Sequence, residues 1–192
     1  MKIKGAYQHQ FSQVPTADIP RSVFDRSHGH KTTFDEGQLI PVYLDEVVPG
    51  DSFNVNATCF ARVATLIKPI MDNISMSLHF FFVPARLVWS NWVKLMGERP
   101  DPVDDYDSDT EYVVPTVSAP AVTGFAAGSL YDYLGIPIGV PDVEISNLPA
   151  RCYNKIYADW YKDQNLIDNP ALDLGDSGDD VADYLIVTGK PK

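Results

Sequence analysis

The sequence has only two cysteines, no long apolar run and far fewer basic than acidic residues. Two cysteines, Cys59 and Cys152, cannot make a disulfide framework, so we expect two buried free thiols in a reducing compartment. No stretch is long enough to cross a bilayer, and the N-terminal residues lack the apolar centre of a signal peptide. These absences predict a soluble protein that is not exported by the usual route.

The sequence also lacks the short motifs that gather catalytic groups. It has no G-x-x-x-x-G-K-[ST] phosphate loop and no G-x-S-x-G turn, and neither cysteine lies in a nucleophile motif. Asp105, Asp107 and Asp109 alternate like calcium ligands, but Thr110 stands where that loop needs glycine. The acidic residues between 173 and 180 also lack ligand spacing. We therefore expect no enzyme, no metal and no cofactor, and two solvated acidic loops.

The charge is unevenly distributed along the chain. The net charge is −11, yet residues 1–31 hold five basic and two acidic residues, or +3, which leaves ten basic and 24 acidic residues, or −14, for the rest. A basic arm can contact phosphates without sequence preference, although the same cations also suit a solvated loop. The acidic remainder argues against a dedicated nucleic-acid-binding domain. The candidate DNA-facing residues of the arm are Lys2, Lys4, Arg21, Arg26 and Lys31.

Fifteen prolines, twelve glycines and many β-branched and aromatic residues favour short strands and ordered loops over a helical bundle. Residues 1–35 show little periodicity and predict an extended N-terminal arm. Alternation of apolar residues predicts strands at 38–46, 53–63 and 74–83, with a turn at 47–51. The strand at 74–83 becomes apolar on both faces, so both faces need cover. A further strand is predicted at 183–188.

Helical spacing predicts helices at 84–96, 129–134 and 149–163. The first and last are rich in aromatic residues, which favours core packing and also suits contacts with a neighbouring chain. The predicted packing or subunit-interface anchors are Phe81, Trp89, Trp92, Tyr153, Tyr157 and Trp160.

One weak metal motif remains open. His28, His30 and Glu36 resemble the H-x-H-then-Glu cluster with which cupins bind a divalent metal, and imidazole and carboxylate are suitable ligands. The gap to Glu36 is one residue too long, and no second histidine motif follows. Because the ligand types fit although the spacing does not, a small metal-dependent cupin that uses these three residues is kept as an alternative function. A glycan-binding jelly roll is a further alternative.

Five segments together resemble the major capsid protein of Microviridae, the small single-stranded DNA bacteriophages, and of the gokushovirus branch in particular. They occur in the order of that family and extend the resemblance over residues 11–168. The segments are S-V-F-D-R-S-H-G-H-K-T-T-F-D-E-G-Q-L-I-P at 22–41, Y-L-D-E-V-V-P-G-D-S-F at 43–53, D-N-I-S-M-S-L-H-F-F-F-V-P-A-R-L-V-W-S-N-W-V-K-L-M-G-E-R-P-D-P at 72–102, L-Y-D-Y-L-G-I-P at 130–137 and R-C-Y-N-K-I-Y-A-D-W-Y-K-D-Q-N-L at 151–166.

The resemblance implies a mainly β viral jelly roll, an antiparallel sandwich with long loop insertions that carry short helices. Family members are much longer, so residues 36–192 are expected to be the N-terminal part of such a domain, with its later strands missing. The implied function is structural: copies of the chain self-assemble into an icosahedral shell around a circular single-stranded DNA genome. The implied partners are these copies, the packaged DNA and minor virion proteins, with no membrane. The protein would belong to the virion and be assembled in the bacterial host cytoplasm.

Overall fold

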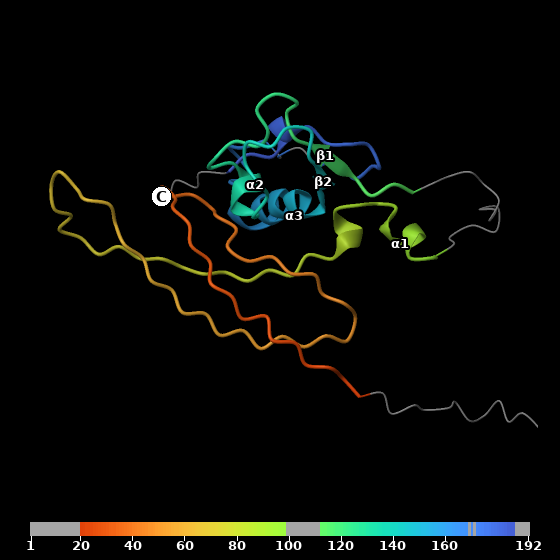
Figure 1. Cartoon of the computed structure of the whole chain (residues 1–192), viewed down its shortest axis with the longest axis horizontal. Coiled ribbons are helices and arrows are strands. Elements are labelled where there is room, and N and C mark those ends of the chain that lie inside the picture. Colours follow the sequence, from red (N-terminus) through yellow and green to blue (C-terminus); the bar gives the residue numbers. More distant parts are fainter. Residues whose placement is uncertain (1–19, 99–111, 169, 171, 187–192) are drawn as a thin grey trace, which may run out of the picture. The chain divides into compact units, whose positions relative to one another are not determined.

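The computed structural model describes residues 20–98, 112–168, 170 and 172–186 (Figure 1). The chain separates into two compact units, Met1–Lys31 and Thr32–Lys192. In the first unit, the described residues are exposed and have no regular secondary structure. All the helices and strands of the described chain belong to the second unit.

Residues 40–83, which we call the extended region, are drawn as a plain tube from orange to yellow-green in Figure 1. The prediction of strands at 38–46, 53–63 and 74–83 is wrong, because none of these segments forms a strand in this structure. Of their residues, only Gln38 takes part in an isolated bridge. No residue of the extended region is buried; Phe60 is 92% exposed and Met71 97%. Alternation of apolar residues places them on one face of an extended segment, but a strand also needs a neighbouring backbone with which to form hydrogen bonds. The described residues bring no such neighbour to this region.

The turn predicted at 47–51 is confirmed. The Asp51 N–H donates to the Val48 carbonyl at 3.0 Å, and Gly50 has φ of +90°. Proline at the second position and glycine with positive φ at the third are the requirements of a type II turn. The Asp51 carboxylate also accepts from the Val48 N–H at 3.0 Å. The conformation of this turn is therefore set by the proline, the glycine and the hydrogen bonds within its four residues.

Helix α2 (Leu130–Tyr133) is confirmed where the sequence predicts it. The Asp132 N–H donates to Ser129 Oγ at 3.4 Å, and the Asp132 carboxylate accepts from the Gly128 N–H at 2.7 Å. At the other end Gly135 has φ of +87°, and the Ile136 N–H donates to the Tyr131 carbonyl. This helix is closed at both ends by its own neighbours in sequence.

Helix α3 (Leu148–Ile156) continues into a π-helical turn, η2 (Tyr157–Tyr161). The two elements together occupy most of the predicted helix at 149–163, with Pro149 in the first turn. The Lys162 N–H donates to the Tyr157 carbonyl at 2.9 Å, five residues back. The wider turn changes the direction of the side chains that follow Ile156, which a purely α-helical prediction does not anticipate.

The helix predicted at 84–96 is broken in two. The structure has a 3-10 turn, η1 (Ala85–Leu87), and a short helix, α1 (Trp92–Leu95). Between them the Ser90 N–H and hydroxyl both donate to the Leu174 carbonyl, at 2.9 and 2.8 Å. A backbone N–H bonded to a distant carbonyl cannot also bond four residues back, so the helix is interrupted there.

The described chain is mostly non-helical, with one antiparallel sheet of two short strands. Strand β1 (Thr116–Ser118) pairs with β2 (Glu144–Ser146), with Val117 opposite Ile145. A 3-10 turn, η3 (Val181–Asp183), occupies the start of the strand predicted at 183–188, which does not form at 184–186; residues 187–188 lie outside the described residues. Two three-residue strands do not test a jelly roll, which stays a prediction.

The hydrophobic core lies among β1, α2, α3 and the residues after η3. Its members come from the described residues between 112 and 186, which we call, together with Val88 and Trp89, the core region. Phe125 and Tyr131 stack within it with ring centroids 4.5 Å apart. The buried cluster consists of Val117, Ala119, Phe125, Leu130, Tyr131, Ala150, Tyr153 and Tyr184.

Candidate functional site

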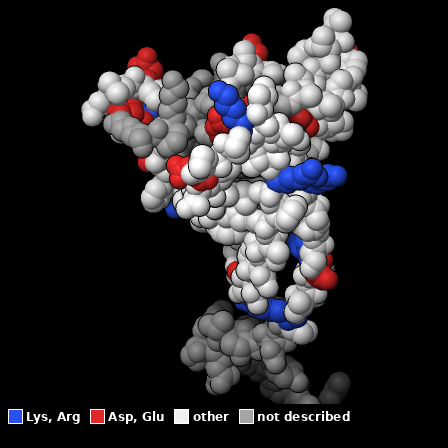
Figure 2. All heavy atoms as spheres, turned by 90° about the vertical axis from the view of Figure 1, so that its left-hand side faces the viewer, with Lys and Arg blue, Asp and Glu red and all other residues white. Residues whose placement is uncertain are grey.

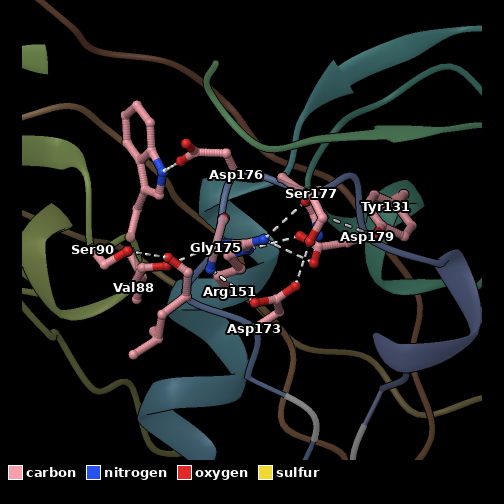
Figure 3. A network of polar contacts seen from close by, with 12 residues as sticks. Val88, Ser90, Tyr131, Arg151, Asp173, Gly175, Asp176, Ser177 and Asp179 are labelled. Atoms are coloured by element: carbon pink, nitrogen blue, oxygen red, sulfur yellow. Dashed lines mark hydrogen bonds and ion pairs between the residues drawn. The ribbon is translucent and has the colours of Figure 1, made fainter. Parts of the chain in front are cut away.

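The most highly organised polar group in the described chain is centred on Arg151 of α3 (Figure 3). Its guanidinium binds Asp179 through two nitrogens, Nε to Oδ2 at 2.7 Å and Nη2 to Oδ1 at 2.9 Å. The remaining bonds go to the carbonyl oxygens of Val88 (3.3 Å), Gly175 (3.0 Å) and Ser177 (3.4 Å). A guanidinium has five N–H donors, so each of them has an acceptor.

The same carboxylate is bound from a second side. Asn147, at the start of α3, donates from Nδ2 to Asp179 Oδ2 at 2.7 Å, and its own Oδ1 accepts from the Tyr131 hydroxyl at 3.0 Å. The Asp179 N–H donates to the Thr116 carbonyl at 2.9 Å. We call Arg151, Asp179, Asn147 and Tyr131 the Arg151 cluster. It connects α2, α3, β1 and the loop before η3.

A neighbouring contact ties η1 and α1 to the same loop. The Asp176 carboxylate accepts from the Trp89 indole nitrogen and from Asn91 Nδ2, the latter at 2.8 Å. Figure 3 shows Asp176 beside Arg151 and the other residues of the cluster. The loop at 173–180, predicted to be solvated, instead places two of its carboxylates on partners about 30 and 85 residues away in sequence.

Burial and charge shift the pKa of several groups in the core region. Burial alone would lower the pKa of Arg151, but its hydrogen bonds to Asp179 and that residue's charge outweigh burial and raise the pKa. Burial and the charge of Asp179 raise the pKa of Tyr184. Bonds from Ser177 and the Gly175 N–H lower the pKa of Asp173. Burial raises the pKa of the Cys152 thiol to about 11, whereas Cys59, predicted to be buried, is exposed.

This arrangement is structural in its chemistry. Arg151 is completely buried, the Asp179 side chain is 4% exposed, and the described buried side-chain polar atoms all have partners. A saturated ion pair has no donor left for a substrate, and breaking it would leave a buried charge. Sequence reasoning missed it. The available signal was a polar line at helical spacing, Asn147, Arg151 and Asn154, on a helix otherwise rich in apolar residues.

The structure distributes the predicted anchors among different environments. Trp89, Tyr153 and Tyr157 are buried within the chain itself, at 0%, 6% and 8% exposure, and the Tyr153 hydroxyl donates to the Leu39 carbonyl at 2.9 Å. Trp92 is half-buried against Trp89, with ring centroids 6.2 Å apart. Trp160 is 72% exposed, and Phe81 is half-buried.

Phe81 and Trp160, distant in sequence, are brought together at the end of η2. Their ring centroids lie 5.9 Å apart, and Phe81 also meets Tyr161 at 6.1 Å. His79 stacks on Phe81 at 6.3 Å and meets the edge of Tyr161 at 6.1 Å. We call His79, Phe81, Trp160 and Tyr161 the aromatic cluster. The sequence predicted two of its members as anchors but not that they touch.

The basic residues of the N-terminal arm are only partly described. Arg21, Arg26 and Lys31 are exposed, whereas Lys2 and Lys4 lie outside the described residues. The face of the molecule in Figure 2 shows basic and acidic side chains dispersed over a mostly uncharged surface. On that face the described residues show no continuous basic surface of the kind that dedicated nucleic-acid-binding domains use.

The described residues offer no support for the metal-binding alternative. Within these ranges, His, Cys, Asp and Glu side chains do not gather in groups of three or more that could hold a metal ion. The Nδ1 atom of His28 lies 3.0 Å from the Arg26 carbonyl. Asp105, Asp107 and Asp109 lie outside the described residues. In the same ranges, no helix combines the length and apolarity needed to span a membrane.

Comparison with known proteins decides the family. Residues 12–192 match the family described as capsid protein (F protein). The chain belongs to this capsid protein family. It is 47% identical over 185 residues to capsid protein VP1 of Bdellovibrio phage phiMH2K, covering 96% of this chain and 34% of the relative. With capsid protein VP1 of Chlamydia phage 1 the identity is 44% over 178 residues, covering 92% of this chain and 30% of the relative.

A more distant relative has the same name. Capsid protein VP1 of Spiroplasma virus 4 is 34% identical over 189 residues, which cover 95% of this chain and 34% of that protein. The predicted resemblance to gokushovirus capsid proteins is therefore confirmed. The chain spans about a third of the length of these curated relatives.

Proposed function

We propose that this chain is the structural part of a major capsid protein from a small single-stranded DNA phage, and that copies of it associate into an icosahedral shell. The observation that carries the proposal is the 47% identity to a capsid protein over 96% of the chain. Membership of the capsid family implies a structural rather than an enzymatic role. The saturated Arg151 cluster agrees with that role, because it stabilises a fold and leaves nothing for turnover.

The extended region supports association. Apolar residues of all three predicted strands lie open, including Phe53 at 46%, Ile74 at 65% and Phe82 at 70% exposure. Exposed apolar surface of this extent is characteristic of proteins that complete their packing against another chain or segment. We therefore keep the jelly roll as the architecture that these segments adopt when their edges are paired. We also keep a division of the chain into an arm at 1–35 and a capsid domain at 36–192.

The exposed fractions of the predicted anchors support a division of these residues between packing within the chain and contacts between subunits. The burial of Trp89, Tyr153 and Tyr157 favours packing within the chain, with Trp92 and Phe81 at its margin. The exposure of Trp160 favours a subunit contact, because a large aromatic ring stabilises an interface by burial. We propose Trp160 as the anchor that meets a neighbouring copy.

For partners, we propose other copies of the chain first, then the packaged DNA and minor virion proteins, all within a virion assembled in the bacterial cytoplasm. The exposed basic residues Arg21, Arg26 and Lys31 would contact phosphates through the N-terminal arm. Removing one phosphate-binding cation reduces the steepness of log affinity against log salt by about 0.7 for single-stranded DNA. Changing the three residues to alanine should thus reduce the slope by about 2; an unchanged slope would remove the arm from this role.

Particle formation tests the main proposal. Two proteins are expressed in a bacterium: the 192-residue chain by itself, and the product of the whole open reading frame that contains it. Electron microscopy of the lysates shows whether particles form, and nuclease digestion shows whether these particles protect DNA. Trp160→Glu should prevent particles, whereas Val122→Glu, at a position 89% exposed, controls for the added charge. Soluble monomers from the encoding frame, with no particle under any condition, would contradict a capsid role.

A further inference from the structure

The aromatic cluster divides the segment at 74–83 into two unlike faces. In an extended chain alternate residues point to opposite sides, so His79 and Phe81 share one face. That face lies against Trp160 and Tyr161 of η2, through ring contacts of 5.9 to 6.1 Å. Phe81 is accordingly half-buried. On this side the segment thus contacts η2 at positions 79 and 81, while the other odd-numbered residues before them, Ser75 and Ser77, stay exposed.

The other face remains open. It carries an apolar residue at every even position, and all five have exposed fractions between 41% and 70%. The odd-numbered face offers mainly serine and histidine before Phe81, so hydrophobicity alone would turn the even face toward the core region. At positions 79 and 81 the structure has the opposite orientation, with the odd-numbered side chains against η2. The residues of the open face are Ile74, Met76, Leu78, Phe80 and Phe82.

The π-helical turn makes this contact possible. The Tyr157 carbonyl accepts from the Lys162 N–H at 2.9 Å, so the last turn is wider than an α-turn and redirects the residues that follow Ile156. Trp160 and Tyr161 both reach Phe81 from the end of that turn. Trp160 stays 72% exposed, so it is not a member of the buried core. The contact is a feature of the surface of α3 and η2 rather than a consequence of core packing.

We propose that the aromatic cluster is a device that selects the face of the segment at 74–83: it holds the odd-numbered face on η2 and keeps the five-residue apolar face free for a sheet. The physical reason is the period of two in an extended chain, because a shift of one residue exchanges the two faces completely. Without the cluster, the more apolar face competes for the same site. The cluster therefore protects the register of the segment before any strand partner is present.

Nuclear Overhauser effects between aromatic rings test this on the full 192-residue chain. In the wild type we expect cross-peaks from Phe81 to Trp160 and from His79 to Tyr161. We expect none from Phe80 or Phe82 to Trp160 or Tyr161. Equal cross-peaks from odd and even positions would overturn the proposal. Phe82→Ala is the matched control, because it removes a ring from the open face and should leave the Phe81–Trp160 cross-peak unchanged.

Trp160→Ala then asks whether the cluster causes the selection. The equilibrium constant between the two faces should shift roughly two- to tenfold toward the even-numbered face, the range set by the free energy of one aromatic pair. The Phe81–Tyr161 cross-peak should therefore weaken, and cross-peaks from Phe80 or Phe82 to Tyr161 should appear. Amide shifts of α3 verify that the core region is intact. Phe81→Leu provides a second variant, in which the His79–Tyr161 cross-peak should weaken. Unchanged cross-peaks in both variants would overturn the proposal, whether or not the chain forms particles.

Discussion

The extended region and the core region have opposite relations between sequence pattern and structure. The extended region has the clearest alternation in the chain, yet no residue of it is buried. The core region has weaker periodicity, yet it contains the buried cluster and the Arg151 cluster. The difference is the source of the partners: Arg151 finds its acceptors within the same chain, whereas a strand needs a neighbouring backbone. A strong local pattern thus states what a segment requires, not whether the requirement is met.

The largest expected loss of stability comes from removing a buried interaction partner in the core region, so that it resembles the extended region in lacking one. Arg151→Met leaves the Asp179 carboxylate buried without its counter-ion, and we expect a loss of about 3 to 5 kcal/mol in the free energy of unfolding. Urea denaturation followed by tryptophan fluorescence measures it. Lys155→Met is the matched control, because the Lys155–Asp159 pair at 2.8 Å is partly exposed and should cost no more than about 0.5 kcal/mol. Equal losses in the two variants would show that the Arg151 cluster is not what stabilises the region.

A second test uses the two cysteines, one in each region. Burial raises the pKa of Cys152 to about 11 from an ordinary value of 9.0. The folded state therefore holds the thiol proton more tightly, so this contribution is complete below pH 9 and is lost as the pH rises through 11. The expected loss is about 2 kcal/mol.

The change in unfolding free energy between about pH 8 and about pH 11 is measured in the wild type and in two variants. Tyr184, whose pKa is also raised, adds the same loss to all three, so the difference between them reports the thiol contribution. Cys152→Ala should remove it, while Cys59→Ala, in the exposed region, should keep it. An identical pH dependence in wild type and Cys152→Ala would refute the assignment to this thiol.

A smaller effect is expected where the two regions join. The Tyr153 hydroxyl donates to the Leu39 carbonyl at 2.9 Å, next to the start of the extended region. Tyr153→Phe removes this bond and leaves a carbonyl without that donor, at a cost of about 1 kcal/mol. Hydrogen exchange of the backbone amides of residues 38–40 and 42 should speed up correspondingly. Tyr133→Phe removes a similar 2.9 Å bond to the Thr33 carbonyl in an exposed setting and should have less effect; the reverse order would contradict the comparison.

The smallest effect is expected inside the extended region itself. Phe80 is 65% exposed, so Phe80→Ala in the isolated chain should change the free energy of unfolding by less than about 0.5 kcal/mol. Phe125→Ala, at a position 2% exposed, should cost about 3 to 5 kcal/mol by leaving a cavity. Thermal unfolding of the two variants compares them directly. A large loss for Phe80→Ala would mean that the extended region is packed in solution.

Elements that need only near neighbours were predicted well. The turn at 48–51 and both caps of α2 form hydrogen bonds only between close neighbours in sequence, so proline, glycine and serine at the right positions were sufficient. Helix α3 was predicted from its spacing, but the π-helical turn at its end was not. The helix at 84–96 failed because Leu174, 84 residues away from Ser90, takes the donors that would continue it.

The Arg151 cluster shows why the candidate site was missed. Its members come from several elements, and the acidic loop around Asp179 has the composition of a solvated segment. A carboxylate in such a loop is buried if a cation from elsewhere in the chain pairs with it, and otherwise stays solvated. The composition of the loop does not indicate whether such a cation lies nearby in the folded chain. The aromatic cluster is similar, since the sequence indicated Phe81 and Trp160 separately and only the fold brought them 5.9 Å apart.

By itself, the sequence determined the family of this protein, its charge division, its tight turn and the position of α2 and α3, because each depends on residue identity or on contacts between close neighbours. The tertiary structure alone decided which acids are buried, where the helix at 84–96 breaks and which side of the segment at 74–83 contacts η2. Each of those outcomes depends on a partner far away in sequence. Hydrogen bonds and ring contacts act over a few ångströms, so the folded chain, and not the order of its residues, settles which groups meet.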